Sequence, residues 1–308
     1  MRRLGLALLL VVLAAVALPP LWFRLFREPA PELPPPGRRV ELASGVAVNV
    51  VEAGTGPAVV LVHGHPGSAT DWRVLAPVLA ARGLRAIAYD RVGYGRSGAR
   101  RDGEYTFAAN ARELALLLAA LDLRDAIVMG WSYGGGTSIV AAQQDPSRIA
   151  RLVLVGSVGP GLPMGASTVE ALLFSGPVLA WVAAVPPVSA AVQAAMSAEA
   201  FSRQPQPEWW LPSLAANLGG GDTRRTMREE GAAYGRQAVP DPTGLSLPVL
   251  VIHGDDDRLV PVAVGHELAK RAPNARLVLV PGGSHMLPVT HAELLAAEIE
   301  AAEDGDVL

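Results

Sequence analysis

From residue 40 onward, short apolar runs alternate with segments of helical periodicity. The runs that are apolar at nearly every position are typical of parallel strands buried on both faces of a sheet. The alternation predicts an α/β fold with a doubly wound, mostly parallel sheet flanked by helices. The predicted strands are 46–52, 58–62, 85–89, 126–129, 152–155, 249–252 and 275–280, and the predicted helices are 72–81, 106–121, 134–144, 262–271 and 289–302.

The alternation stops between residues 158 and 243. This stretch has no clear strand pattern, but it holds apolar helical segments at 171–185 and 190–201 and three consecutive glycines at 219–221. We interpret residues 158–243 as a helical cap, or lid. It is inserted into an α/β core formed by residues 40–157 and 244–308.

The first 27 residues have the pattern of a membrane-targeting segment. Two arginines precede residues 4–23, which carry no charge and are long enough to cross a bilayer as a helix. Trp22 suits a membrane interface, and basic residues follow it. The pattern favours a protein anchored in the membrane by a single N-terminal helix. The alternative is a signal peptide cleaved after Ala15-Val16-Ala17, which gives a secreted or periplasmic protein.

A proline-rich stretch separates this segment from the core. Residues 28–39 hold five prolines, which predict a stiff, extended spacer. The net charge of the 308-residue chain is −3 and its basic residues are scattered, so we expect no nucleic-acid partner. The chain has no cysteine, which excludes disulfides and a cysteine nucleophile.

A serine flanked by glycines follows the strand predicted at 126–129. Residues 130–134 read Gly-Trp-Ser-Tyr-Gly, a G-x-S-x-G pattern that places Ser132 between a strand and a helix. Such an abrupt turn strains the serine backbone and leaves no room for side chains two positions away on either side. The same pattern also fits a small residue in a glycine turn. Ser132 is therefore a candidate nucleophile only if a base and an orienting acid accompany it.

Both partners follow at later strand ends. Residues 253–261 read HGDDDRLVP after one predicted strand, and residues 281–286 read PGGSHM after the next. The carboxyl ends of parallel strands meet at one edge of the sheet, so His285 and a carboxylate from the first segment can reach Ser132. Three adjacent aspartates, Asp255, Asp256 and Asp257, leave the acid open at this point.

Over residues 40–302 the chain resembles the α/β-hydrolase family. Within that family it resembles lidded esterases, lipases, haloperoxidase-like enzymes and carbon-carbon bond hydrolases. The resemblance implies Ser132 as nucleophile, His285 as base and, because the family's turn reads G-x-x-D, Asp257 as acid. It also implies an oxyanion hole formed by the backbone N–H groups of His65 and Tyr133.

Other histidines and the remaining strand ends add little chemistry. We interpret His63 and His253 as structural, and we assign His65 a role through its main chain alone. The strand before the cap ends in Gly-Ser-Val-Gly at 156–159, with no carboxylate that could replace Asp257. No histidine pair has convincing metal spacing, so we expect no metal and no cofactor.

The cap and the nucleophile suggest the substrate. Related epoxide hydrolases and haloalkane dehalogenases carry aspartate where this chain has Ser132, so acyl transfer is favoured. The candidate substrate-binding residues are the apolar cap side chains Phe174, Trp181, Trp209 and Trp210, although such residues can equally form the core of the cap. We therefore predict a serine hydrolase of small-molecule or lipid-like carboxylic esters that works through an acyl-serine intermediate.

Two alternatives stay open. One is hydrolysis of a carbon-carbon or amide bond by the same triad. An aminopeptidase-like enzyme would need an acidic cap residue for the substrate amine, and Glu170, Glu199 and Glu208 are candidates. The other alternative is a non-catalytic binding protein of the same fold.

Overall fold

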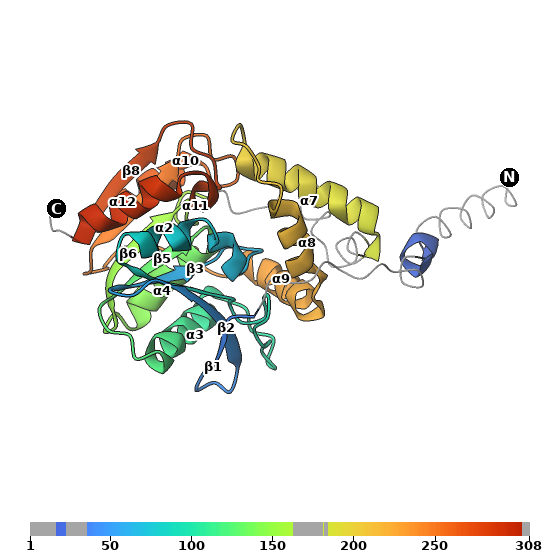
Figure 1. Ribbon diagram of the computed structural model, residues 1–308, viewed down its shortest axis with the longest axis horizontal. Coiled ribbons are helices and arrows are strands. Elements are labelled where there is room, and N and C mark those ends of the chain that lie inside the picture. The colour runs from blue at the N-terminus through green and yellow to red at the C-terminus, as the bar shows by residue number, and fades with distance from the viewer. Residues whose placement is uncertain (1–16, 23–35, 163–180, 182–183, 304–308) are drawn as a thin grey trace, which may run out of the picture.

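A mixed eight-stranded sheet forms the centre of the protein. The computed structural model of the chain describes residues 17–22, 36–162, 181 and 184–303. The strand order is β1-β2-β4-β3-β5-β6-β7-β8 (Figure 1). Strand β2 pairs antiparallel with β1 and β4, and all the other neighbouring pairs are parallel. The strands are β1 (Arg38–Glu41), β2 (Ala47–Ala53), β3 (Ala58–Val62), β4 (Arg85–Tyr89), β5 (Ala126–Trp131), β6 (Ile149–Val155), β7 (Val249–Gly254) and β8 (Ala275–Val280).

Helices cover both faces of this sheet. One face packs against α3 (Phe107–Ala120), α4 (Tyr133–Gln144) and α10 (Val262–Arg271). The other face packs against η1 (Ala69–Trp72), α2 (Leu75–Ala81), α11 (Leu287–Thr290) and α12 (Ala292–Glu303). Alternate side chains of β3 show the division, because Val60 and Val62 enter the first core cluster while Val59 and Leu61 enter the second. The predicted doubly wound α/β fold is thus confirmed.

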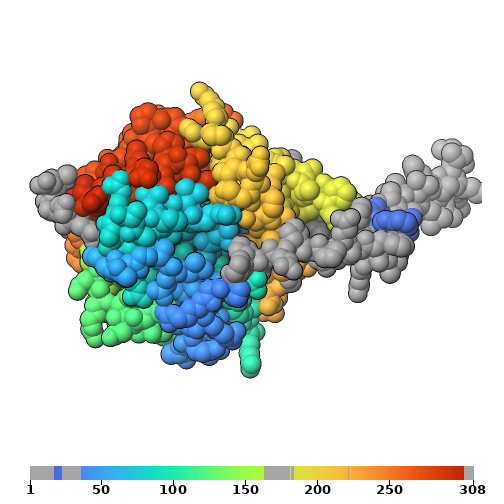
Figure 2. Space-filling view, viewed as in Figure 1, coloured from blue at the N-terminus to red at the C-terminus, as the bar shows by residue number. Residues whose placement is uncertain are grey.

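Between β6 and β7, the described part of the chain forms three long helices. They are α7 (Pro186–Phe201), α8 (Trp210–Gly219) and α9 (Gly221–Tyr234), and they lie together at one end of the molecule (Figure 1). In Figure 2 the gold surface of α8 lies against the cyan surface of the segment that follows β3. Two contacts fix this junction: Asn217 Nδ2 donates to the Gly67 carbonyl at 2.7 Å, and the Arg73 guanidinium lies 4.6 Å from the centre of the Trp209 ring. The sequence pattern did not predict α8 or α9.

The predicted membrane anchor requires correction. No helix within the described part of the chain is both long enough and apolar enough to cross a membrane. Of the predicted span, residues 17–22 form a short helix, whereas residues 4–16 and 23 lie outside the described residues. The membrane and transmembrane predictions, and the localisation built on them, are therefore wrong. The described helix at residues 17–22 is far shorter than the roughly 20 residues that a bilayer-spanning helix needs.

The N-terminal edge of the sheet begins earlier than the sequence pattern indicated. Arg38 and Arg39, which we had assigned to the proline-rich spacer, lie in β1, where they pair with Val50 and Asn49 of β2. Residues 28–35 of that spacer lie outside the described residues. β1 is an edge strand in which three of the four positions are exposed. Its exposed side chains are charged, so the sequence lacks the apolar pattern that predicts a strand.

A buried carboxylate stabilises the turn after β3. Ser68 caps η1, and its backbone N–H donates to Asp71 Oδ2 at 3.0 Å in a capping box. Burial raises the pKa of Asp71 to about 7, and the neighbouring Asp90 carboxylate acts in the same direction against the hydrogen bond from Ser68. In the native state Asp71 is therefore protonated at mildly acidic pH.

We expect Asp71→Asn to remove one component of the pH dependence of stability. The folded-state pKa is raised, so the unfolded state loses its proton first, and wild-type stability falls as pH rises from about 4 to about 7. Relative to Asp71→Asn, the free energy of unfolding should fall by up to about 1.4 kcal/mol per pH unit in this window and stay constant above it. Urea unfolding of both proteins across this range measures the difference. A difference that does not change with pH would contradict the assignment.

Candidate active site

Ser132 occupies the one-residue turn between β5 and α4. Its backbone adopts φ +55° and ψ −122°, a strained conformation for a residue with a side chain. The flanking glycines are required by space: a Cβ at Gly130 would lie 2.5 Å from the Gly134 carbonyl oxygen, and one at Gly134 would lie 2.1 Å from the Val62 carbonyl oxygen. The turn therefore has the geometry that the G-x-S-x-G pattern predicts.

Asp257 and His285 form a buried pair at the ends of β7 and β8. His285 Nδ1 lies 2.7 Å from Asp257 Oδ2. The other carboxylate oxygen, Oδ1, accepts hydrogen bonds from the backbone N–H groups of Leu259 at 2.9 Å and Val260 at 2.8 Å. Burial opposes ionisation of this carboxyl, but the charge and hydrogen bond of His285 outweigh burial, and the pKa of Asp257 is lowered. The carboxylate is thus ionised and fixed, as an acid that orients a histidine must be.

The end of β6 brings the serine and this pair together. The Ser132 backbone N–H donates to the Val155 carbonyl at 3.0 Å. At the next residue, a Cβ on Gly156 would lie 3.1 Å from Asp257 Oδ2 and 3.3 Å from His285 Nδ1. Trp131 adds a direct link, since its indole N–H donates to the His285 carbonyl at 2.9 Å. The hydrogen bonds recorded for the described residues include none between Ser132 and His285; such bonds are often long without substrate and shorten when it binds.

The segment after β3 lies against the serine. A Cβ on Gly64 would lie 3.5 Å from Ser132 Oγ. Within the described part of the chain, no acceptor is recorded for the backbone N–H of His65 or of Tyr133. Two unpaired donors beside a serine hydroxyl are what an oxyanion hole requires.

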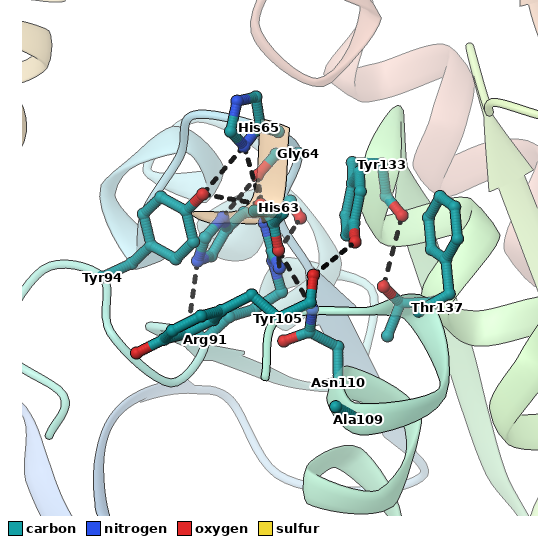
Figure 3. A network of polar contacts seen from close by, with 12 residues as sticks. His63, Gly64, His65, Arg91, Tyr94, Tyr105, Ala109, Asn110, Tyr133 and Thr137 are labelled. Carbon is teal, nitrogen blue, oxygen red and sulfur yellow. Dashed lines mark hydrogen bonds and ion pairs between the residues drawn. The ribbon is translucent and has the colours of Figure 1, made fainter. Parts of the chain in front are cut away.

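The imidazole of His65 has partners that the sequence analysis missed. His65 Nδ1 lies 2.7 Å from Oε2 of Glu230, a residue of α9, and 2.9 Å from the Tyr94 hydroxyl. Figure 3 shows His65 and Tyr94 directed toward one another, with Arg91 and His63 beneath them. Glu230 is fully buried and also forms an ion pair with Arg91, with Nη1 2.6 Å from Oε1.

A signal for Glu230 was present in the sequence. The buried residues of α9 include Thr223, Thr226 and Glu230, whose spacing of three and four places them on one face of a helix. These side chains are polar, so this face of the helix lacks the apolar stripe from which a buried helix is predicted. Thr226 lies in close contact with the core: a Cβ at Gly93 would lie 2.1 Å from its hydroxyl oxygen.

The other buried histidines have structural partners. The Arg91 backbone N–H donates to His63 Nε2 at 2.9 Å, and His63 Nδ1 lies 3.0 Å from the Gly64 carbonyl. Burial lowers the pKa of His63 well below its usual value, and the Arg91 charge adds to this effect. His253 Nε2 lies 2.9 Å from the Val260 carbonyl. Among the described residues, no three histidine, aspartate or glutamate side chains gather in a group that could hold a metal ion.

The predicted substrate-binding side chains lie in different surroundings. Trp210 is buried, packs on Phe201 with ring centres 5.5 Å apart, and donates from its indole to Ser197 Oγ at 3.0 Å. Trp209 packs against Trp210 and Arg73. Trp181 is half-buried, and Phe174 lies outside the described residues. The structure therefore brings Ser132, Asp257, His285, His65 and Tyr133 to one place and gives Trp210 a packing role between α8 and α7.

Comparison with known proteins agrees with this geometry. Residues 57–292 match the family model described as alpha/beta hydrolase fold. The chain belongs to the α/β-hydrolase family. It is 29% identical over 275 residues to a non-heme haloperoxidase of Rhodococcus erythropolis, with 84% of this chain and 97% of that relative covered. It is 30% identical over 275 residues to a 2-hydroxymuconate semialdehyde hydrolase of Pseudomonas putida, covering 88% of this chain and 95% of the relative.

Solved structures of α/β-hydrolases have the same fold. The esterase RhEst1 from a Rhodococcus species superposes with a TM-score of 0.69 at 27% identity, covering 86% of this chain and 97% of that one. The family, the fold and a hydrolase-type enzyme are thereby shown. The relatives differ among themselves in the reactions for which they are named, so the family membership of this α/β-hydrolase does not select its substrate.

We expect a fluorophosphonate probe to label this α/β-hydrolase at Ser132. Ser132→Ala should abolish labelling, because it removes the nucleophile. Asp257→Asn should slow labelling on the order of 10³- to 10⁴-fold, because an amide cannot hold His285 in the required tautomer. Mass spectrometry of the labelled protein over time measures each rate.

Asp255→Asn provides a matched control in the same turn. Asp255 is exposed and accepts a hydrogen bond from the Gly282 backbone N–H at 2.6 Å, which an asparagine oxygen can also accept. This variant should be labelled within about twofold of the wild-type rate, as substitutions away from a site usually allow. Equal slowing in both asparagine variants would contradict the choice of Asp257.

Proposed function

We propose that this α/β-hydrolase cleaves carboxylic esters through an acyl intermediate on Ser132. The observation that supports it most is the buried pair of Asp257 and His285, 2.7 Å apart, beside a serine held in a strained turn. A serine hydroxyl is a weak nucleophile at neutral pH and gains reactivity from such a base. The nucleophile, the base and the acid of this reaction are Ser132, His285 and Asp257.

In the first step, His285 accepts the hydroxyl proton as Ser132 Oγ attacks the ester carbonyl carbon. The backbone N–H groups of His65 and Tyr133 donate to the oxyanion of the tetrahedral intermediate. Asp257 holds the Nδ1 side of the imidazole and stabilises its positive charge. His285 then gives the proton to the leaving alcohol, and the acyl group remains on Ser132. In the second step His285 deprotonates a water molecule, which attacks the acyl carbonyl carbon. His285 then returns that proton to Ser132 Oγ as the bond between Oγ and the acyl carbon breaks, and the carboxylic acid leaves.

Esters place the smallest demand on this site. An alkoxide leaving group needs one proton, and His285 can supply it. A carbon-carbon bond substrate requires further polar groups to stabilise a carbanion as it departs. The buried guanidinium of Arg91 is already engaged, because it donates to the His63 and Gly64 carbonyls and to Glu230.

The described residues of the predicted cap offer little for the amine of a peptide substrate. Glu199 and Glu208 are exposed, and Glu170 lies outside the described residues. Glu230 is buried near the site, but the Arg91 charge already neutralises it. An aminopeptidase-like reaction therefore has less support than ester hydrolysis.

The surroundings of Tyr133 favour a hydrophobic acyl group. Its ring stacks on Phe107 with centres 4.3 Å apart and lies 6.0 Å from the ring of Tyr234 on α9. Phe107 and Tyr133 are buried in the core, whereas Tyr234 is half-buried and can present apolar ring surface beside the predicted oxyanion residue. We therefore propose that the ester substrates carry hydrophobic, lipid-like acyl groups.

A p-nitrophenyl ester series from acetyl to palmitoyl tests this function. Wild-type protein should hydrolyse the esters with a preference for medium or long chains, and Ser132→Ala should lose on the order of 10⁶-fold in kcat, as expected when a triad nucleophile is removed. Release of p-nitrophenol measures both.

Three other outcomes would replace the proposal. Turnover of 2-hydroxymuconate semialdehyde by a protein inert toward every ester would assign a carbon-carbon bond hydrolase. Turnover of amino-acid p-nitroanilides would assign an amidase. A protein that neither turns over any substrate nor reacts with the fluorophosphonate would be a binding protein of the hydrolase fold.

A further inference from the structure

Glu230 contacts the segment that follows β3 with its side chain. It belongs to α9, one of the helices between β6 and β7, and its side chain is fully buried. Its Oε2 atom lies 2.7 Å from His65 Nδ1 and accepts from the Tyr94 hydroxyl at 2.6 Å. Its Oε1 atom accepts from Arg91 at 2.6 Å and from Asn110 at 3.0 Å. Both carboxylate oxygens of Glu230 thus contact residues of the α/β core.

Arg91 connects Glu230 to His63 and Gly64, the two residues before His65. Its Nε donates to the His63 carbonyl at 3.1 Å, and its Nη2 donates to the Gly64 carbonyl at 2.8 Å. The same guanidinium donates to both oxygens of Glu230. The ion pair therefore holds three successive residues, His63 and Gly64 by their carbonyls and His65 by its imidazole.

These three residues determine where the His65 N–H points. The peptide between Gly64 and His65 contains that N–H, and its carbonyl is the oxygen that Arg91 binds. Gly64 lies against Ser132, so a small rotation of this peptide changes the distance from the N–H to an oxyanion formed on the serine. A misplacement of about 1 Å can cost on the order of 10²-fold in rate.

We propose that Glu230 is a positioning residue for the oxyanion hole, acting on His65 through the imidazole and on His63 and Gly64 through Arg91. This inference rests on the proposed function. It makes α9 part of the catalytic apparatus rather than only a cover over it. A purely structural role for Glu230 would stabilise the contact between α9 and the core without changing the chemical step.

Substitution of His65 tests the link and leaves the buried ion pair intact. His65→Ala removes the donor to Glu230, whereas His65→Asn can place an amide N–H at the position of Nδ1. His65→Ala should lower kcat for p-nitrophenyl esters about 10- to 100-fold with KM within about threefold, because the transition state loses more than the ground state. His65→Asn should recover kcat to within about threefold of wild type.

Asn110→Ala is the control. It also removes one hydrogen bond to the same carboxylate, but it leaves the contacts of His65 in place. Both alanine variants should lose similar thermal stability, and Asn110→Ala should keep kcat within about threefold of wild type. Equal loss of kcat in both alanine variants, unchanged kcat in His65→Ala, or failure of His65→Asn to recover activity would each overturn the proposal.

Crystal structures of the two alanine variants separate this inference from the proposed function. In His65→Ala the backbone nitrogen of residue 65 should move relative to Ser132 Oγ or adopt more than one position, while in Asn110→Ala it should stay in place. An unmoved nitrogen in His65→Ala would overturn the positioning role. A wild-type protein inactive on esters would overturn the ester function alone, because the structural comparison does not depend on turnover.

Discussion

The turn at Ser132 is the constraint on which the site depends. The chain passes from strand β5 to helix α4 through one residue with φ +55°, so strand and helix lie too close for side chains at Gly130 and Gly134. The same closeness brings the carbonyl of Val62 against α4 and places Gly64 next to Ser132. Because Tyr133 is the first residue of α4, its N–H has no partner within the helix. The strained turn at Ser132 thus places the half-buried serine directly before the unpaired N–H of Tyr133.

Strand order then brings the remaining groups to this turn. Strand β6 lies between β5 and β7, and the chain has glycine at position 156, directly after β6. A side chain there would contact Asp257 and His285, which approach from the ends of β7 and β8. Trp131 completes the arrangement by donating to the His285 carbonyl, so the residue before the nucleophile also fixes the loop of the base. Residues more than a hundred positions apart meet because parallel strands end at one edge.

Sequence reasoning succeeded where an element carries a clear apolar pattern. The bounds expected for β3, β4, β8 and α10 agree with the structure, because continuous apolar runs and a clear helical stripe mark them. The pattern missed α9, whose buried face consists of Thr223, Thr226 and Glu230. The pattern also missed β1, an exposed edge strand. Apolar composition near the N-terminus predicted a membrane anchor, which no described helix supports. Motif order and the resemblance to the α/β-hydrolase family together predicted Ser132, Asp257 and His285, but the partners of the His65 side chain could come only from tertiary structure.

The polar character of α9 has a physical explanation in the geometry that it enforces. Burying Arg91 and Glu230 together costs desolvation of two charges, and a hydrophobic pair of similar volume often stabilises a fold as well or better. An apolar contact would hold α9 on the core, but it has no direction and could not fix the carbonyls of His63 and Gly64 or the imidazole of His65. The guanidinium and carboxylate have fixed donor and acceptor geometry, so they specify the position of each group that they bind. Orientation of the segment beside Ser132, rather than stability, is what this buried ion pair adds to the fold.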